Sequence, residues 1–228
     1  MASEPTRVNF HLYVVTDRQQ TAGRALEEVV AAAARGGAGA IQLREKDLSA
    51  RDLYALGARI QAAISPYKVP LLINDRLDVA LALDAAGVHL AGHSLPTAAA
   101  RRVLGAGKLL GVSTHSVEEA RRAAEDGADF IVFGPVFTTP SKVAYGPPQG
   151  LQQLTAVVRQ VGLPVLAIGG IDHTNLPQVL QAGAYGVAMI RAVLAAPDPY
   201  HATQQLQAAF AGTRQGELTK TAAPTSRR

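Results

Sequence analysis

Short apolar stretches recur along the chain and alternate with longer stretches in which apolar residues return every three or four positions. Most of the short stretches are almost continuously hydrophobic, which is typical of parallel strands buried on both faces. They lie at residues 11–17, 40–46, 69–75, 87–91, 109–113, 129–135, 164–170 and 186–190. The pattern predicts a strand–helix unit repeated eight times.

The longer stretches carry signals that start and stop helices. Ser49 and Ser116 each stand three residues before an acidic residue, Asp52 and Glu119, which is the spacing of a capped helix N-terminus. Glycine-containing dipeptides stand before the next strand at Gly37-Ala38, Ala86-Gly87, Gly127-Ala128 and Gly183-Ala184. Glycine there favours the left-handed turn that ends a helix.

Eight such units in 228 residues predict an α/β fold, a closed (β/α)8 barrel in a single domain. The barrel is expected to span residues 9–211, after a short N-terminal extension at 1–8 and before a flexible basic tail at 212–228. A doubly wound open sheet is the alternative. Its dinucleotide-binding version loses support because no G-x-G-x-x-G follows the first strand.

Composition narrows the classes of protein. The absence of cysteine excludes disulfide frameworks, thiolate metal sites and a cysteine nucleophile. No apolar run approaches the ~18 residues of a membrane span, so no membrane partner is expected. Residues 1–7 lack the apolar stretch of a secretory signal, which predicts a cytoplasmic protein.

The net charge of +4 belongs mostly to the C-terminal segment. Residues 212–228 carry four basic side chains and one acidic side chain, which leaves about +1 for the rest of the chain. Aromatic residues make up 5% and tryptophan is absent, so the chain lacks the basic, aromatic-rich surface of a nucleic-acid binder. No nucleic-acid partner is expected.

Polar residues gather where the predicted strands end, which is the working face of this fold. Strand alternation after residue 40 puts Gln42, Arg44 and Lys46 on one face. Two cations at this position suit a phosphate or a carboxylate. Structural salt bridges to Asp17 or Asp75 are the alternative.

The last two strands end in a candidate phosphate site. Gly169-Gly170 can present bare backbone N–H groups to an anion, and Ile190-Arg191 follows the neighbouring strand. A tight turn is the alternative for the two glycines. Lys142 lies in a loop with Pro and Ser, where it is either a residue that closes over the ligand or an ordinary surface lysine.

His115 is the best candidate for a general acid or base, because it follows the fifth strand and imidazole titrates near neutral pH. Helix capping or loop packing is its alternative role. His89 lies within the fourth strand, where a place in the core or the barrel interior is expected. Asp75 is the best single metal ligand, and alone it is weak support for a metal site.

Several ordered motifs resemble those of the thiamine phosphate synthase and TenI superfamily. They are QLREK at 42–46, INDR at 73–76, GVHL at 87–90, GVSTHSVEEA at 111–120, FGPVFTTPSK at 133–142, AIGGI at 167–171 and AGAYGVAMI at 182–190. The resemblance covers about residues 11–195. It implies a (β/α)8 barrel and a role in thiamin biosynthesis.

The synthase branch joins a hydroxymethylpyrimidine diphosphate to a thiazole phosphate, with Mg²⁺ and release of pyrophosphate. On this resemblance, residues in the chain take the family's roles. Arg44, Lys46, Asn74 and Lys142 would hold pyrophosphate, Gln42, Ser113, Thr139 and Ser141 would contact substrates, and Asp75 would bind Mg²⁺.

The second Mg²⁺-binding Asp of the synthase pattern is replaced here by Ser94, which weakens a site for a hard cation. The sequence is therefore expected to be closer to TenI, a thiazole tautomerase that uses no metal. Its catalytic residue would be His115, and its partner a small phosphorylated thiazole bound through the backbone at Gly169, Gly170, Ile190 and Arg191. Thiamine phosphate synthase with Mg²⁺ and a non-catalytic, phosphate-ligand-binding regulatory barrel are the alternatives. The oligomeric state is open, with a homo-oligomer as one option.

Overall fold

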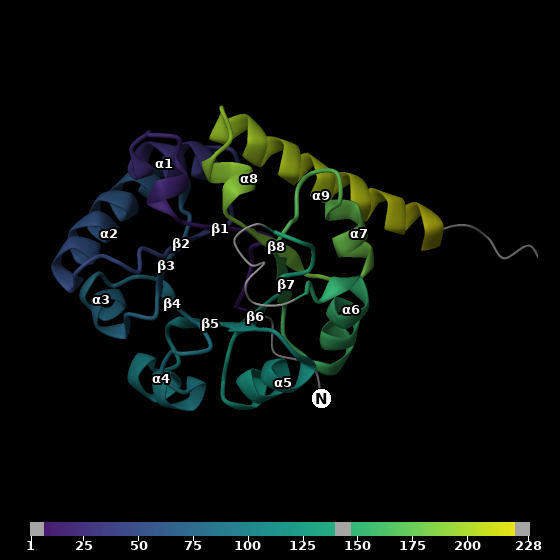
Figure 1. Ribbon diagram of the computed structural model, residues 1–228, viewed down its shortest axis with the longest axis horizontal. Coiled ribbons are helices and arrows are strands. Elements are labelled where there is room, and N and C mark those ends of the chain that lie inside the picture. The colour runs from purple at the N-terminus through teal and green to yellow at the C-terminus, as the bar shows by residue number, and fades with distance from the viewer. Residues whose placement is uncertain (1–6, 140–146, 222–228) are drawn as a thin grey trace, which may run out of the picture.

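The computed structural model describes residues 7–139 and 147–221, and side chains within the last helix up to residue 212. In this part of the chain the strands are all parallel and pair in chain order until β8 pairs with β1 (Figure 1). The strands are β1 (Leu12–Val15), β2 (Ala40–Leu43), β3 (Leu71–Asn74), β4 (Gly87–Leu90), β5 (Leu109–Thr114), β6 (Phe130–Phe133), β7 (Val165–Ile168) and β8 (Gly186–Met189). The predicted single-domain (β/α)8 barrel, a TIM barrel, is confirmed.

Both faces of the strands are buried, which explains why the apolar stretches are nearly continuous. Tyr13, Leu72 and Phe130 belong to the cluster that fills the barrel, and the rings of Tyr13 and Phe130 meet edge to face with centroids 5.6 Å apart. Val14 and Ile73 point the other way and join the cluster under the surrounding helices. Alternation therefore assigns each strand residue to the interior or to the outer layer.

The helices form a ring around the barrel (Figure 1). They are α1 (Leu26–Arg35), α2 (Ala50–Ile64), α3 (Leu77–Ala82), α4 (Thr97–Leu104), α5 (Val117–Glu125), α6 (Gly150–Gln160), α7 (Leu176–Gln181), α8 (Arg191–Leu194) and α9 (Pro199–Thr221), with 3-10 turns η1 (Arg18–Gln20) and η2 (Ser65–Tyr67). Helix α9 packs against α1, α7 and α8. Within the described ranges, none of the helices is long and apolar enough to cross a membrane.

The predicted helix starts are confirmed. The Ser49 hydroxyl accepts a hydrogen bond from the Asp52 amide at 3.2 Å. The Ser116 hydroxyl accepts one from the Glu119 amide at 3.1 Å. Both serines thus satisfy an amide that the first helical turn leaves without a partner.

Three of the four predicted glycine exits adopt left-handed backbone, with φ of 106° at Gly37 and 94° at Gly127 and Gly183. The exception is Ala86-Gly87, because Asp84 takes the left-handed conformation after α3 (φ 50°). Gly87 is needed for space instead. A Cβ atom there would lie 2.1 Å from the carbonyl oxygen of Leu109 on β5.

The C-terminal region differs from the sequence pattern. The eighth unit holds two helices, since α8 covers four residues and α9 follows at Pro199. The backbone of α9 continues to Thr221, inside the segment 212–228 for which no helix is predicted. Starting a helix orders several residues for one hydrogen bond, whereas extending it orders only one residue for each new bond. Residues that form helices poorly can therefore continue a helix that has already formed.

Candidate active site

Four polar side chains enter the barrel interior near its carboxyl-terminal end. Gln42, Asn74, His89 and Ser113 alternate along their strands with residues of the outer layer, and the register sets His89 beside Asn74 and Gly111. We call this end of the barrel, with the loops that follow β1–β8, the mouth. The structure thus brings Gln42, Asn74 and Ser113 together, and His89, for which a core or barrel-interior place is expected, lies among them.

Gln42 contacts Tyr13, a buried residue that the sequence analysis did not single out. Its Nε2 atom donates a hydrogen bond to the Tyr13 hydroxyl at 3.1 Å. Burial raises the pKa of the Tyr13 hydroxyl well above its usual value, although the contact with Gln42 opposes the shift. Tyr13 is therefore a neutral phenol in the floor of the mouth.

His89 is held as a neutral imidazole. Burial lowers the pKa of His89 to about 3, Asp75 opposes this shift and Arg44 adds to it. Its Nε2 atom lies 2.8 Å from the Ser113 hydroxyl oxygen, while Nδ1 has no hydrogen-bond partner among the described residues. The expected interior place of His89 is thus observed, and the strand register adds that it stands beside Asn74.

The two cations after β2 differ in exposure. Arg44 is half-buried and Lys46 is exposed. The Arg44 amide donates to the Thr16 hydroxyl at 2.9 Å. No salt bridge joins either cation to a carboxylate in the part of the chain described here, so the alternative of pairs with Asp17 or Asp75 is not observed.

Asp75 stands where β3 ends, in left-handed backbone (φ 59°) that is uncommon for a residue with a side chain. One carboxylate oxygen accepts hydrogen bonds from the Ser94 hydroxyl and from the Ala91 amide. The other accepts one from the Asn74 side-chain amide at 2.9 Å and lies 3.8 Å from Nε2 of His93. The loop after β4 therefore places Ser94 directly on Asp75.

These oxygens fit a magnesium ion that is shared with a substrate. No cluster of three or more His, Asp or Glu side chains suited to a metal occurs within residues 7–139 and 147–212. However, Mg²⁺ usually keeps several waters and takes one or two carboxylates together with phosphate oxygens. The Asp75 carboxylate would be a ligand of this kind, and the Ser94 hydroxyl lies beside it, where it donates to Asp75 and accepts the Ala91 amide at 2.7 Å.

His115 follows β5 at the mouth and is exposed. Its Nδ1 atom lies within hydrogen-bond distance of the Gly134 carbonyl oxygen, and its backbone amide donates to the Glu119 carboxylate at 2.7 Å. Nδ1 therefore donates, which leaves Nε2 as the acceptor of the neutral ring. Thr139 is the last residue of the described range 7–139. Ser141 and Lys142, which were predicted to contact the substrates, lie outside the described residues.

The glycines after β7 approach the segment after β6 very closely. Gly169 has φ 100°, and a Cβ atom there would lie 2.6 Å from Cβ of Pro135. Gly170 has φ 65°, and its Cβ would lie 2.7 Å from the Thr138 carbonyl oxygen. Gly169 and Gly170 therefore form a tight turn, and the turn also leaves their backbone N–H groups uncovered by side chains of their own.

Ile190 follows β8 and is the N-cap residue of α8. The glycines follow β7, the neighbouring strand of the barrel. The Ile190 backbone (φ −116°, ψ −88°) is outside the helical range, and the exposed Arg191 begins the helix. Since β7 and β8 are paired, both turns lie on the same side of the mouth. Their placement agrees with a shared phosphate site, which stays a prediction.

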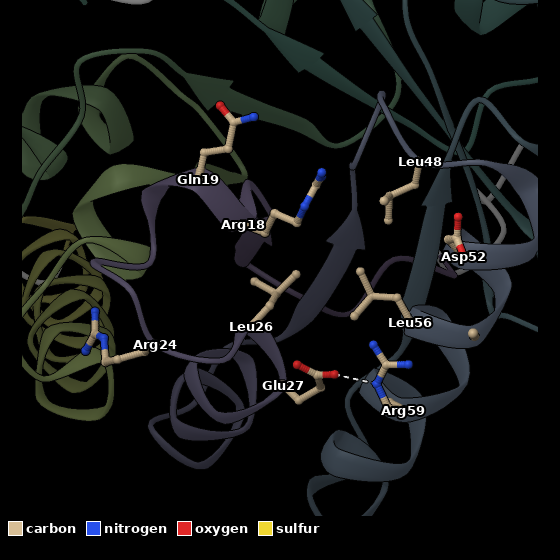
Figure 2. A pocket seen from close by; sticks show the side chains of 10 residues that line it. Arg18, Gln19, Arg24, Leu26, Glu27, Leu48, Asp52, Leu56 and Arg59 are labelled. Carbon is tan, nitrogen blue, oxygen red and sulfur yellow. Dashed lines mark hydrogen bonds and ion pairs between the residues drawn. The ribbon is translucent and has the colours of Figure 1, made fainter.

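A depression lies outside the barrel, between α1 and α2 (Figure 2). Its volume of about 570 Å³ is in the range of a ligand pocket. Its arginines, however, are engaged. Arg59 donates to Glu27 at 2.6 Å, Arg24 donates to the Leu194 carbonyl at 2.9 Å, and Arg18 pairs with Glu45. Its basic side chains therefore support the fold and are not free for an anion.

The barrel and its polar mouth are those of a (β/α)8-barrel enzyme with its working face at the carboxyl ends of the strands. The sequence profile of the thiamine monophosphate synthase family matches residues 12–193. The chain belongs to this family.

Individual relatives agree. The thiamine-phosphate synthases of Roseiflexus sp. (strain RS-1) and Roseiflexus castenholzii are 50% and 51% identical over 200 and 195 residues. These matches cover 88% and 86% of this chain, and 85% and 86% of the relatives. The solved structure of thiamine phosphate pyrophosphorylase from Pyrococcus furiosus is 37% identical and superposes with a TM-score of 0.82, covering 90% of this chain and 96% of that one.

These relatives contradict the expected thiazole tautomerase. They are named as synthases, and nothing among them supports the TenI branch. The error came from reading Ser94 as the loss of a metal site. In the structure the Ser94 hydroxyl donates to the Asp75 carboxylate, and the metal roles of both residues stay predictions.

Proposed function

We propose that this protein is a thiamine-phosphate synthase, a transferase that joins a hydroxymethylpyrimidine diphosphate to a thiazole phosphate and releases pyrophosphate. The observation that carries the proposal is the match to synthases at 50–51% identity over about 200 residues. The mouth supports it, since among the described residues it offers two cations without a carboxylate partner, the Asp75 carboxylate and a buried polar floor.

In the joining reaction, the unshared electron pair of the thiazole ring nitrogen attacks the methylene carbon of the pyrimidine. The bond from that carbon to the diphosphate oxygen breaks, and pyrophosphate leaves with the bonding electrons. Negative charge therefore grows on the leaving group. Fixed cations near that group stabilise the transition state more than the ground state.

Arg44, Lys46 and Asn74 are the residues for this charge. Arg44 and Lys46 follow β2 at the mouth and have no described carboxylate partner, and the Asn74 side chain donates to Asp75. Lys142 is assigned to the same group by resemblance. A magnesium ion held by Asp75 and Ser94 would supply further positive charge to the diphosphate oxygens when bound.

The floor of the mouth suits the pyrimidine ring. Gln42 and Ser113 offer hydrogen-bonding groups inside the barrel, beside the neutral His89 and Tyr13. A flat, uncharged ring with nitrogen atoms at its edge matches a buried floor of uncharged donors and acceptors, since an unpaired charge there would be costly. Thr139 and Ser141 are assigned to the substrates by resemblance.

The thiazole phosphate is assigned to the other side of the mouth. Backbone amides at Gly169, Gly170, Ile190 and Arg191 would hold its phosphate. This arrangement sets the two substrates side by side, with the diphosphate toward β2 and β3. Bringing two reactants into contact converts a bimolecular step into a unimolecular one.

The predicted proton-transfer role of His115 belongs to the tautomerase reaction and is not carried over. The attacking thiazole nitrogen bears no proton, and pyrophosphate is a stable leaving group. The synthase reaction therefore gives His115 no proton to move.

A substrate-omission assay tests the function. The purified protein is incubated with both substrates and MgCl₂, and pyrophosphate release is followed by a coupled phosphate assay. We expect release that depends on both substrates and falls when Mg²⁺ is chelated. Absence of release at high enzyme concentration with both substrates present would reject the proposal.

A further inference from the structure

Glu45 is a buried carboxylate that stands between the two cations of the mouth in sequence, yet contacts neither of them. Its side chain is 3% exposed, whereas Arg44 is half-buried and Lys46 is exposed. Alternation turns Glu45 away from the barrel interior. A carboxylate in such a place is costly unless donors surround it, so its partners indicate what it does.

All described hydrogen-bond partners of its carboxylate come from the segment that follows β1. The Thr16 hydroxyl donates to Glu45 at 2.7 Å. The Arg18 amide donates to both carboxylate oxygens, at 3.1 and 3.2 Å, and the Arg18 guanidinium donates at 3.0 Å. Glu45 therefore clamps the loop after β1 onto the end of β2.

The clamp reaches Arg44 through one atom. The Thr16 hydroxyl uses its hydrogen on Glu45, so its oxygen is left to accept the Arg44 amide at 2.9 Å. Without the carboxylate, that hydroxyl is free to rotate and donate elsewhere. Glu45 thus fixes the acceptor that holds the backbone of Arg44.

Arg18 offers an internal comparison, because it also pairs with Asp47. Its guanidinium donates to Asp47 at 2.6 Å, and the Asp47 side chain is 55% exposed. Arg18 extends from η1 toward the loop that carries Leu48 (Figure 2). Two carboxylates therefore contact one arginine, but Glu45 alone of the two also contacts Thr16.

We propose that Glu45 is a positioning residue for anion binding: by clamping Thr16 and Arg18, it holds Arg44 and Lys46 toward the diphosphate of the substrate. This inference rests on the proposed function for the identity of the anion. Glu45 touches no reacting atom and acts through the backbone of its neighbours.

The test compares Glu45→Gln with Asp47→Asn, which removes a carboxylate from the same arginine. Full-length variants are titrated calorimetrically with inorganic pyrophosphate at fixed MgCl₂. Glutamine keeps one acceptor oxygen and turns an NH2 group toward either the Thr16 or the Arg18 donors, so the clamp opens on one side and we expect Glu45→Gln to raise the pyrophosphate Kd about tenfold or more. Asp47→Asn is expected to change it less than about twofold, since its ion pair is solvent-exposed.

A double variant shows whether the effect passes through Arg44. In an Arg44→Ala background, Glu45→Gln is expected to add less than about twofold to the Kd, because coupled residues are not additive. In kinetics, Glu45→Gln is expected to raise KM for the diphosphate substrate while KM for thiazole phosphate stays nearly constant. A purely structural role would lower the amount of active enzyme and leave both KM values unchanged.

Three results overturn the inference: an unchanged Kd in Glu45→Gln, equal losses in the two carboxylate variants, or the full loss persisting without Arg44. If Glu45→Gln fails to fold, Thr16→Val replaces it, since it removes the acceptor of the Arg44 amide and keeps the ion pair with Arg18. An unchanged Kd in that variant likewise overturns the inference. Failure of the proposed function is separate, because it appears as a wild-type protein that forms no thiamine phosphate.

Discussion

The polar side chains of the mouth differ in how firmly the barrel holds them. Gln42 and His89 lie within strands and are 2% exposed. Arg44 and Lys46 follow a strand and reach toward solvent. Under the proposed function, such a preorganised floor would bury the ring of the substrate and leave its diphosphate near the cations at the rim.

His89 is expected to make stability depend on pH. Its folded pKa of about 3 is below the usual value of 6.5, so in acid the unfolded chain binds the proton that the folded protein refuses. This contribution is complete above pH 6.5 and is lost as the pH falls toward 3. Between pH 7.5 and 5, the free energy of unfolding should fall by about 2 kcal/mol.

Urea titrations at a series of pH values measure this loss, and His89→Gln provides the comparison. The variant has no group at this position that titrates, so its stability should change much less over the same range. Parallel pH profiles for the two proteins would show that His89 is not held neutral by the fold.

His115→Ala is expected to keep most of the synthase activity. A general acid or base contributes about 10²- to 10⁴-fold to a rate, and the joining reaction needs none. We therefore expect kcat to fall less than about tenfold. Steady-state kinetics measure it, with His173→Ala, an exposed histidine after β7, as the matched control.

A loss of kcat beyond about 10²-fold in His115→Ala alone would contradict this account and indicate proton transfer. The same variant thus separates the synthase reaction from the tautomerase that the sequence first suggested.

Strand-end residues could be predicted because alternation fixes which side chains turn inward. Gln42, Asn74 and Ser113 follow from that rule. His89 follows from it as well, but the register of β4 against β3 was needed to set it beside Asn74. Ser94 was misjudged, because its meaning depends on its contact with Asp75, a residue nineteen positions away that a sequence pattern does not place.

Among the elements, strands were more predictable than the final helices. Burial on both faces leaves a continuous apolar signal for each strand. No comparable pattern in the sequence marks where α8 ends and α9 begins. Helix α9 also continues beyond the last apolar residues that recur at helical spacing. The extra helix packs on α1 and α7, so tertiary contacts define it.

The turn after β7 should be intolerant of side chains. Gly169→Ala places a Cβ atom 2.6 Å from Pro135 in a backbone with φ 100°. Such strain costs about 1–3 kcal/mol, so the free energy of unfolding should fall by that amount. KM for thiazole phosphate should rise in parallel, because the same turn is assigned to its phosphate.

Gly162→Ala is the matched control. Gly162 precedes the same strand, and a Cβ atom there meets nothing within 4 Å. Denaturant unfolding should show a change of less than about 0.5 kcal/mol for this variant. Equal stability of the two variants would mean that the turn relaxes, and would remove the steric reason for Gly169.

For the whole molecule, the sequence established the architecture and located the working face, while the choice between reactions needed the relatives. The overall charge was misleading on its own, because most of it lies in residues 212–228. What distinguishes the mouth is local: two cations without described carboxylate partners follow β2, and Asp75 with its Ser94 contact follows the neighbouring strand β3. Under the proposed function, these residues would bind a diphosphate together with a metal ion.

The most direct measurement is the stoichiometry of products in one reaction. The wild-type protein is incubated with hydroxymethylpyrimidine diphosphate, thiazole phosphate and MgCl₂, and thiamine phosphate and pyrophosphate are quantified together by ³¹P NMR. The account predicts that the two products form in equal amounts and only when both substrates are present. Pyrophosphate without thiamine phosphate, or neither product at high enzyme concentration, would contradict it.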